Sequence, residues 1–153
     1  MREIKYRAWD KSKELLVNAE LILGIRFDRR HQEPALITYT RKKMNPTMEI
    51  SHLDKIYCNE FELMQYTELK TTDYKEIYDG DLLRFNDHSY DRTGGNMNDR
   101  ILVGEVAFSC GMWIVKTKDG HFDLYTLLLN DDEAEVIGNI HIHPHLLEVD
   151  SNA

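Results

Sequence analysis

Three histidines at alternating positions are the residues of this chain best spaced for metal chemistry: His141, His143 and His145. On a β-strand alternate side chains share one face, and neutral imidazoles bind Zn²⁺ or Ni²⁺. Pro144 stands between the last two histidines and disrupts regular strand geometry, so we do not expect the common face to persist. We therefore predict no native metal site and no cofactor; a metal titration of the three histidines tests this.

Two carboxylates flank a glycine in the acidic turn of residues 78–81, where Asp79 and Asp81 stand on either side of Gly80. Such a pair could hold a cation or act in hydrolysis, but a hydrolytic site needs further residues at set distances. Aspartates also fix turns by accepting hydrogen bonds from backbone N–H groups, and glycine tolerates the positive φ of tight turns. We interpret these aspartates as turn residues that set the register of the strand beginning at Leu82.

Motifs for nucleophilic catalysis and phosphate binding are absent from the sequence. It contains no Gly-x-Ser-x-Gly elbow, and residues 93–96 lack the Gly-Lys-Ser/Thr ending of a phosphate-binding loop. Cys58 and Cys110 lie far apart without an activating motif, which is typical of buried or half-buried thiols in a reducing cytosol. We predict no catalytic, cofactor-binding or metal-ligating residue, and we do not expect an enzyme.

The net charge of −8 is unevenly distributed over the 153 residues. Residues 1–118 hold 19 acidic and 19 basic side chains, whereas residues 119–153 hold 8 acidic side chains and no Lys or Arg. Phosphate binding depends on Lys and Arg, so the C-terminal surface is a poor candidate for nucleic acid. The basic segment from Arg26 to Lys43 could contact phosphates, or it could meet the acidic C-terminal region of the same or a neighbouring chain. We favour the second interpretation.

Apolar residues alternate with a period near two over much of the length, which favours strands. Strands are expected within residues 4–8, 14–17, 21–27, 36–40, 82–85, 101–109, 112–117, 121–129 and 136–140. Pro144 predicts a final helical turn, whereas residues 54–64 fit either a short helix or a strand. Residues 87–100 are polar and contain a glycine pair, so we predict a long loop there.

Short strands at this spacing predict a mainly β fold with some short helix. Lys118, Asp119 and Gly120 form a strong hairpin signal. Because the acidic turn leads into an apolar strand, we expect an SH3-like, partly open barrel in the C-terminal half, packed with N-terminal strands and a hairpin. No run of about 18 apolar residues exists, so we expect no membrane span.

Three blocks of sequence carry a resemblance to a known family: residues 2–10, residues 63–67 with 75–83, and residues 136–140 with Pro144, Leu146 and Leu147. They resemble the opening strand, central signature and closing block of the YopX family, small proteins of bacteriophages and prophages of Gram-positive bacteria. There are two departures. The family usually has glycine where this chain has Glu68, and often a flexible turn such as Asn-Gly where it has Asp73 and Tyr74.

The resemblance implies one YopX-like domain over residues 1–153, with an N-terminal β subregion at 1–62 and the SH3-like subregion at 63–150. It implies a cytoplasmic phage or prophage protein without known activity, and it carries over no catalytic or binding residue. We expect a homo-oligomeric protein-interaction or structural module whose first partner is a copy of itself, with a phage or host protein as a further candidate partner. The alternative is a nucleic-acid-binding accessory protein that uses Arg26 to Lys43.

Overall fold

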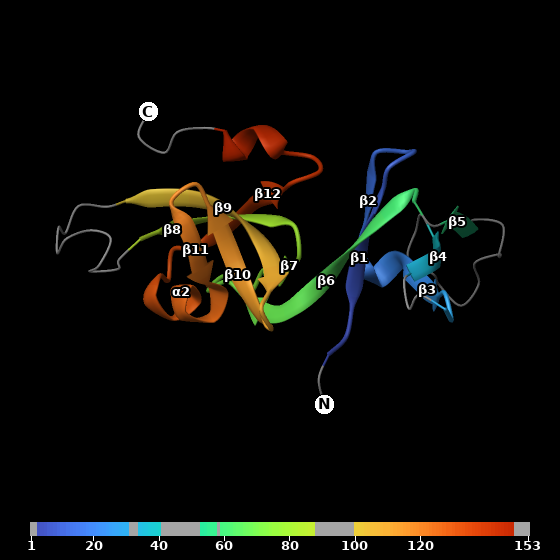
Figure 1. The fold of residues 1–153 in the computed structure, drawn as a ribbon, viewed down its shortest axis with the longest axis horizontal. Helices are drawn as coiled ribbons and strands as arrows, with labels where there is room; N and C mark the ends of the chain where they lie inside the picture. The colour runs from blue at the N-terminus through green and yellow to red at the C-terminus, as the bar shows by residue number, and fades with distance from the viewer. Residues whose placement is uncertain (1–2, 31–33, 41–52, 58, 88–99, 149–153) are drawn as a thin grey trace. The chain divides into compact units, whose positions relative to one another are not determined.

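The computed structural model describes residues 3–30, 34–40, 53–57, 59–87 and 100–148 (Figure 1). Its secondary structure is mainly β with one short α-helix in these ranges, which confirms the predicted fold class at this level. The chain divides into two compact units, the N-terminal unit of residues 3–65 and the C-terminal unit of residues 66–153. The packing of the two halves as one domain stays a prediction.

The N-terminal unit begins with a hairpin of β1 (Tyr6–Asp10) and β2 (Leu15–Val17), in which Ala8 lies opposite Val17. The polar residues after β1 form the turn between the two strands. Asp10 is buried, and its Oδ1 accepts hydrogen bonds from the backbone N–H groups of Ser12 and Lys13 at 3.1 and 3.2 Å. These bonds satisfy backbone donors that the reversal leaves without strand partners, so Asp10 fixes the turn.

A three-stranded antiparallel sheet completes this unit: β3 (Ile22–Phe27), β4 (Pro34–Thr40) and β5 (Leu53–Tyr57), in that order, with η1 (Ala19–Leu21) before it. Ile25, Ile37 and Ile56 stand opposite one another across the three strands. Together with Ala8, this row contributes to the apolar cluster of the unit. The hydroxyl of Tyr39 on β4 donates to Asp10 Oδ2 at 3.2 Å, which ties the sheet to the β1–β2 turn.

Strand β6 (Phe61–Lys70) is ten residues long and changes its partner along its length. Residues 61–65 pair with β1, whereas Tyr66 and Lys70 pair with β7 (Glu76–Tyr78). The resulting sheet order is β2-β1-β6-β7. Residues 54–57 and 61–64 therefore belong to strands, with a turn at residues 59 and 60, which resolves the ambiguity between helix and strand in favour of strand.

The C-terminal unit contains a five-stranded antiparallel sheet in the order β11-β10-β9-β8-β12, with β11 and β12 at its edges. Its strands are β8 (Asp81–Asn86), β9 (Ile101–Ser109), β10 (Met112–Thr117), β11 (Gly120–Asp123) and β12 (Glu135–Asn139). Gly120, at φ 130°, pairs with Thr117 and closes the predicted hairpin. The described strands thus form an open sheet, and no SH3 barrel is shown by their pairing. Of residues 87–100, only 87 and 100 lie within the described part.

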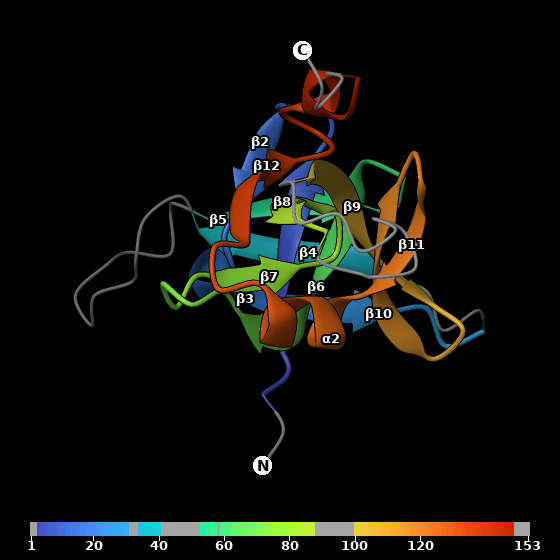
Figure 2. The ribbon, with the colours of Figure 1, turned by 90° about the vertical axis from the view of Figure 1, so that its left-hand side faces the viewer.

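The segment 121–129 corrects the sequence prediction, because its second part is a helix and not a strand. After β11 the chain enters α2 (Leu124–Asn130), which lies against β10 and β11 (Figure 2). Asp123 caps this helix: its Oδ1 accepts from Tyr125 N at 3.2 Å and its Oδ2 from Thr126 Oγ1 at 2.6 Å. Leu124 and Leu127, three residues apart, are buried on one side.

The chain ends its described part with η3 (Pro144–Leu147), so the predicted helical turn after Pro144 is confirmed as a 3₁₀ helix. Buried side chains of β7–β10 and α2 form the apolar cluster of the C-terminal unit, with Ile77, Leu83, Val106, Val115 and Leu124 at its centre. None of the described helices is long and apolar enough to cross a bilayer.

Candidate functional site

The acidic turn has the architectural role that its sequence indicates. Asp81 is only 1% exposed, and its Oδ2 accepts a hydrogen bond from Tyr78 N at 2.8 Å. Gly80 adopts φ 82°, donates its N–H to Val106 O at 2.8 Å and accepts from Ile140 N at 2.9 Å. The turn is thus fastened to β9 and to the residue after β12, and the Asp81 carboxylate is directed at the backbone.

Asp79, the other carboxylate of the turn, is half-buried. Burial raises the pKa of its carboxyl above the usual value, and the negative charge of Glu105 raises it further, whereas Lys116 lowers it. A shifted pKa accompanies many active sites, but burial accounts for the main part of this one. The raised pKa of Asp79 therefore reflects its burial within the turn.

The three histidines do not share a strand face. His141 lies in a turn, His143 immediately precedes η3, and His145 lies within it. His143 Nδ1 accepts from Asn139 N at 3.4 Å, and the ring centroids of His143 and His145 are 6.2 Å apart. Among the described residues, no group of three or more His, Cys, Asp or Glu side chains is placed to hold a metal ion.

Cys110 departs from expectation because its side chain is exposed and not buried. It occupies the first position of the two-residue β9–β10 turn at φ 51°, followed by Gly111 at φ 80°. Positive φ at both positions is the geometry of a type I′ hairpin turn. Phe108 is also exposed, although its ring packs edge-on against Trp113 with the ring centroids 5.1 Å apart. Cys58 lies outside the described residues.

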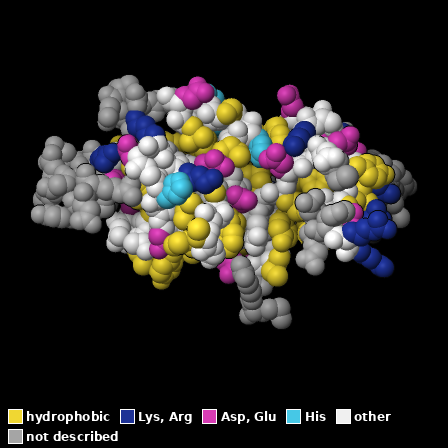
Figure 3. Space-filling view, in the orientation of Figure 1, with side chains coloured by type: hydrophobic (Ala, Val, Ile, Leu, Met, Phe, Trp, Pro, Cys, Tyr) yellow, Lys and Arg dark blue, Asp and Glu magenta, His cyan; other side chains and the backbone are white. Residues whose placement is uncertain are grey.

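The basic segment is described only in its first part, since Arg41, Lys42 and Lys43 lie outside the described ranges. Arg26, Arg29 and Arg30 are all exposed at and after the end of β3, where Figure 3 shows Lys and Arg side chains gathered near that strand. Within the described residues, no carboxylate forms an ion pair with these three arginines. They form a cationic surface available to an anionic partner.

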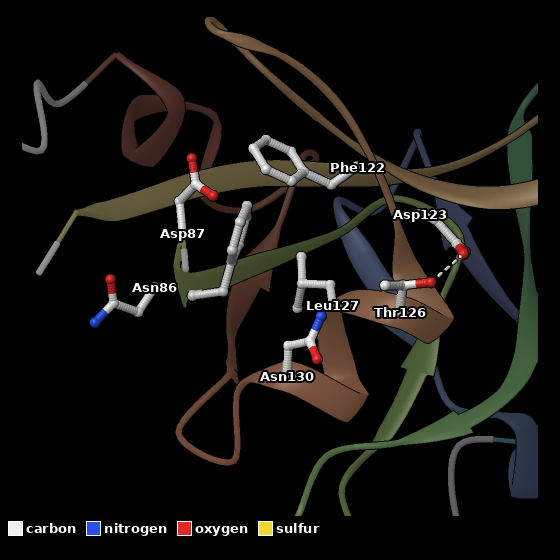
Figure 4. Close-up of a pocket in the computed structure, with 8 residues that line it drawn as sticks. Asn86, Asp87, Phe122, Asp123, Thr126, Leu127 and Asn130 are labelled. Carbon is white, nitrogen blue, oxygen red and sulfur yellow. Dashed lines mark hydrogen bonds between the residues drawn. The ribbon is translucent and has the colours of Figure 1, made fainter. Parts of the chain in front are cut away.

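A cavity of about 410 Å³ in the C-terminal unit is the feature that the sequence did not reveal (Figure 4). It forms where the end of β8, the end of β11 and one side of α2 meet. Its apolar lining comes from Phe85, Phe122 and Leu127. The Phe85 and Phe122 rings pack edge-on, with their centroids 5.0 Å apart. The polar lining consists of Asn86, Asp87, Asp123, Thr126 and Asn130. We call this space the C-terminal cavity.

The carboxylates of the C-terminal cavity are held in place by neighbouring groups. Asp87 is buried, and its Oδ2 lies 3.7 Å from Arg100 Nη1. Asp123 is fixed by its capping bonds. Asp131 does not line the cavity, but its Oδ2 accepts a hydrogen bond from the backbone N–H of the lining residue Asn86 at 2.6 Å. Figure 4 shows Asp87 and Phe122 on one side of the space, with Leu127 and Asn130 of α2 on another.

The lining of the cavity combines apolar and polar groups. None of the eight lining residues is Cys, Ser, His or Lys, and the Thr126 hydroxyl donates to the Asp123 carboxylate. An apolar group that carries a cation or hydrogen-bond donors would match the rings and the carboxylates. The sequence signal for α2 was Asp123 followed by leucines at helical spacing.

A family model described as "YopX protein" matches residues 5–148 of the chain. The chain belongs to the YopX family. Protein EF1440 from Enterococcus faecalis has a similar structure, with a TM-score of 0.64, 23% sequence identity, and coverage of 96% of this chain and 99% of that one. YopX from Bacillus subtilis gives a TM-score of 0.55 at 20% identity, with coverage of 94% and 97%. At these identities the two structures show a shared fold alone. No curated protein matched the sequence.

The two departures from the expected YopX pattern fall at positions of left-handed backbone. Glu68 and Tyr74, where the resemblance predicted glycine or a flexible turn, adopt φ 68° and 64°. Pairing between β6 and β7 is irregular at this point, and Thr67 holds the distortion: its hydroxyl donates to Ile77 O at 2.8 Å and accepts from Leu69 N at 3.1 Å. The left-handed geometry is thus retained here without the glycine that usually permits it.

Proposed function

We propose that this chain is a protein-interaction module that assembles with copies of itself, and that it is not an enzyme. The separation of charge between its units carries the proposal. Residues 1–65 contain 12 Lys and Arg against 10 Asp and Glu, whereas residues 66–153 contain 7 against 17. Surfaces of opposite charge attract and orient partners, so a positive face of one copy is favoured beside a negative face of another.

The lining of the C-terminal cavity and the family membership of the chain also support an interaction role. The C-terminal cavity combines aromatic rings with carboxylates, a lining that suits an apolar partner carrying a cation. We propose in addition that the five-stranded sheet is a partly open barrel of the SH3-like kind; the return of β12 to pair with β8 supports this. Family membership supports the proposal that the protein acts in the cytoplasm of a cell carrying a phage or prophage, and recognises a phage or host protein.

Sedimentation equilibrium of the full chain tests the proposed self-association. The mass of one chain is 18.0 kDa. We expect a multiple of this mass at low salt and a smaller average mass at high salt, because screening weakens attraction between exposed charges. A mass of one chain at every protein concentration would refute the proposal.

Nucleic-acid binding is the second candidate, favoured by the three exposed arginines at the end of β3. Phosphate contacts by these side chains would give an affinity that falls steeply with salt. A gel-shift series with double-stranded DNA and with RNA, begun at low salt, tests this candidate. Absence of any shift at the lowest salt concentration would remove it.

A further inference from the structure

The lining of the C-terminal cavity defines what it can accept. Phe85, Phe122 and Leu127 offer an apolar floor, and the carboxylate of Asp123 stands beside it, whereas Asp87 is buried and paired with Arg100. An occupant that combines an apolar group, which leaves water, with a cationic donor to Asp123 would match this lining. Because the C-terminal unit carries ten more acidic than basic residues, 17 against 7, the field around the cavity also favours a cation.

The rim of the cavity extends its apolar surface. Tyr125 and Leu129 on α2 are 58% and 65% exposed, although their helix neighbours Thr126 and Asn130 line the cavity. Residues four apart lie on the same side of a helix, so the two exposed side chains form one stripe next to the opening. Figure 3 shows hydrophobic side chains gathered over the region of α2. A partner that fills the cavity with one side chain could cover Tyr125 and Leu129 with its neighbouring residues.

Residues 27–30 of this same chain have the matching chemistry. Phe27 is 47% exposed at the end of β3, and Arg29 and Arg30 follow it in an exposed turn. The Asp28 carboxylate is directed back to Arg30 N at 2.6 Å. Three lysines of the unit are already engaged in ion pairs: Lys5 pairs with Glu3, Lys11 with Glu62, and Lys13 with Asp54. The arginines beside Phe27 have no such pairing among the described residues.

We propose that the C-terminal cavity of one copy binds residues 27–30 of a second copy, with Phe27 against the aromatic floor and an arginine beside Asp123. This inference rests on the proposed self-association and specifies its contact. The two surfaces are different parts of one chain, so the contact is heterologous. Each copy then offers one donor segment and one acceptor cavity, and repetition closes a ring or extends a filament.

Sedimentation of charge variants of the full chain tests this contact. R29E/R30E should weaken association by about tenfold or more, because both cations become anions facing carboxylates. The matched control K55E/K70E changes the net charge equally at two other exposed positions and should leave association within about twofold. D123N should also weaken association, while its amide preserves the helix cap, since Asn caps as well as Asp; circular dichroism checks that the fold persists.

A peptide provides a readout that does not depend on assembly. The blocked hexapeptide Ile-Arg-Phe-Asp-Arg-Arg, residues 25–30, is added to R29E/R30E protein and amide NMR shifts are followed. We expect shifts at Phe122, Thr126 and Leu127, and none with a peptide whose arginines are glutamates. A peptide without effect on these residues would overturn the cavity as the site.

The failures of the two proposals are distinguishable. A wild-type chain that is monomeric throughout overturns self-association and this contact together. A wild-type oligomer that R29E/R30E and D123N leave unchanged overturns only the contact. If the peptide binds the cavity but R29E/R30E and D123N leave the oligomer unchanged, a second copy is not the occupant of the cavity.

Discussion

Replacement of Glu68 by glycine should stabilise this protein. Glu68 is exposed and adopts φ 68° within a strand, held there by the two hydrogen bonds of Thr67. A side chain with a Cβ in the left-handed region costs roughly 1–2 kcal/mol, which glycine avoids. Glycine in turn loses more backbone freedom on folding, which costs roughly 0.5–1 kcal/mol. The difference predicts that Glu68→Gly raises the free energy of unfolding by about 0.5–1 kcal/mol.

Urea unfolding followed by tryptophan fluorescence measures this change as a shift in midpoint at constant slope. Thermal unfolding should show a rise of about 1–4 °C for a chain of this size. Glu68→Ala is the matched control, because alanine removes the carboxylate but keeps the Cβ and its strain. A gain from alanine equal to that from glycine would show that the carboxylate, and not the backbone, was the source. A loss of stability in Glu68→Gly would refute the reasoning outright.

Three further predictions concern the packing and charges described above. The raised pKa of Asp79 means that its protonated form contributes stability that is fully present below about pH 3.8 and is lost as pH rises through the folded-state pKa. Asp79→Asn should therefore be more stable than wild type at pH 7, and thermal unfolding should show this advantage vanish below about pH 3.8. Gly138→Ala places a Cβ against the His143 ring, so it should cost about 1–3 kcal/mol in urea unfolding, and less in a His143→Ala background. Tyr39→Phe removes the donor to buried Asp10 and should cost about 1–3 kcal/mol, whereas Tyr57→Phe, at an exposed position, should change stability by less than about 0.5 kcal/mol.

The acidic turn and the hairpins could be predicted because their chemistry is local. Gly80 and Gly120 adopt positive φ where their neighbours require a reversal, and Asp81 accepts a bond from a residue three positions earlier. The strands around them follow from alternation. Such features depend on residues that are close in sequence, so one chain read alone is enough to place them.

The helix α2 and the cavity could not be predicted in the same way. The apolar run after Asp123 fits a strand by its composition, although Asp123 and the spacing of Leu124 and Leu127 also fit the capped helix that the structure shows. With that run read as a strand, Thr126 and Asn130 would not share a side with Leu127. The cavity forms only because α2 and the end of β11 lie beside the end of β8. Phe85 and Phe122, which both line it, are 37 positions apart in the sequence, and no local pattern predicts that they come together.

The position of β6 has a consequence for how the gene can change. Domain boundaries usually fall in exposed linkers. Here the boundary between the units falls between Gln65 and Tyr66, inside a strand whose first half pairs with β1 and whose second half pairs with β7. Recombination at this point would join two halves of β6 from different parents inside one strand, where each half must still fit its own partner strand. The boundary between the units therefore lies in a paired strand and offers no linker at which they could be exchanged.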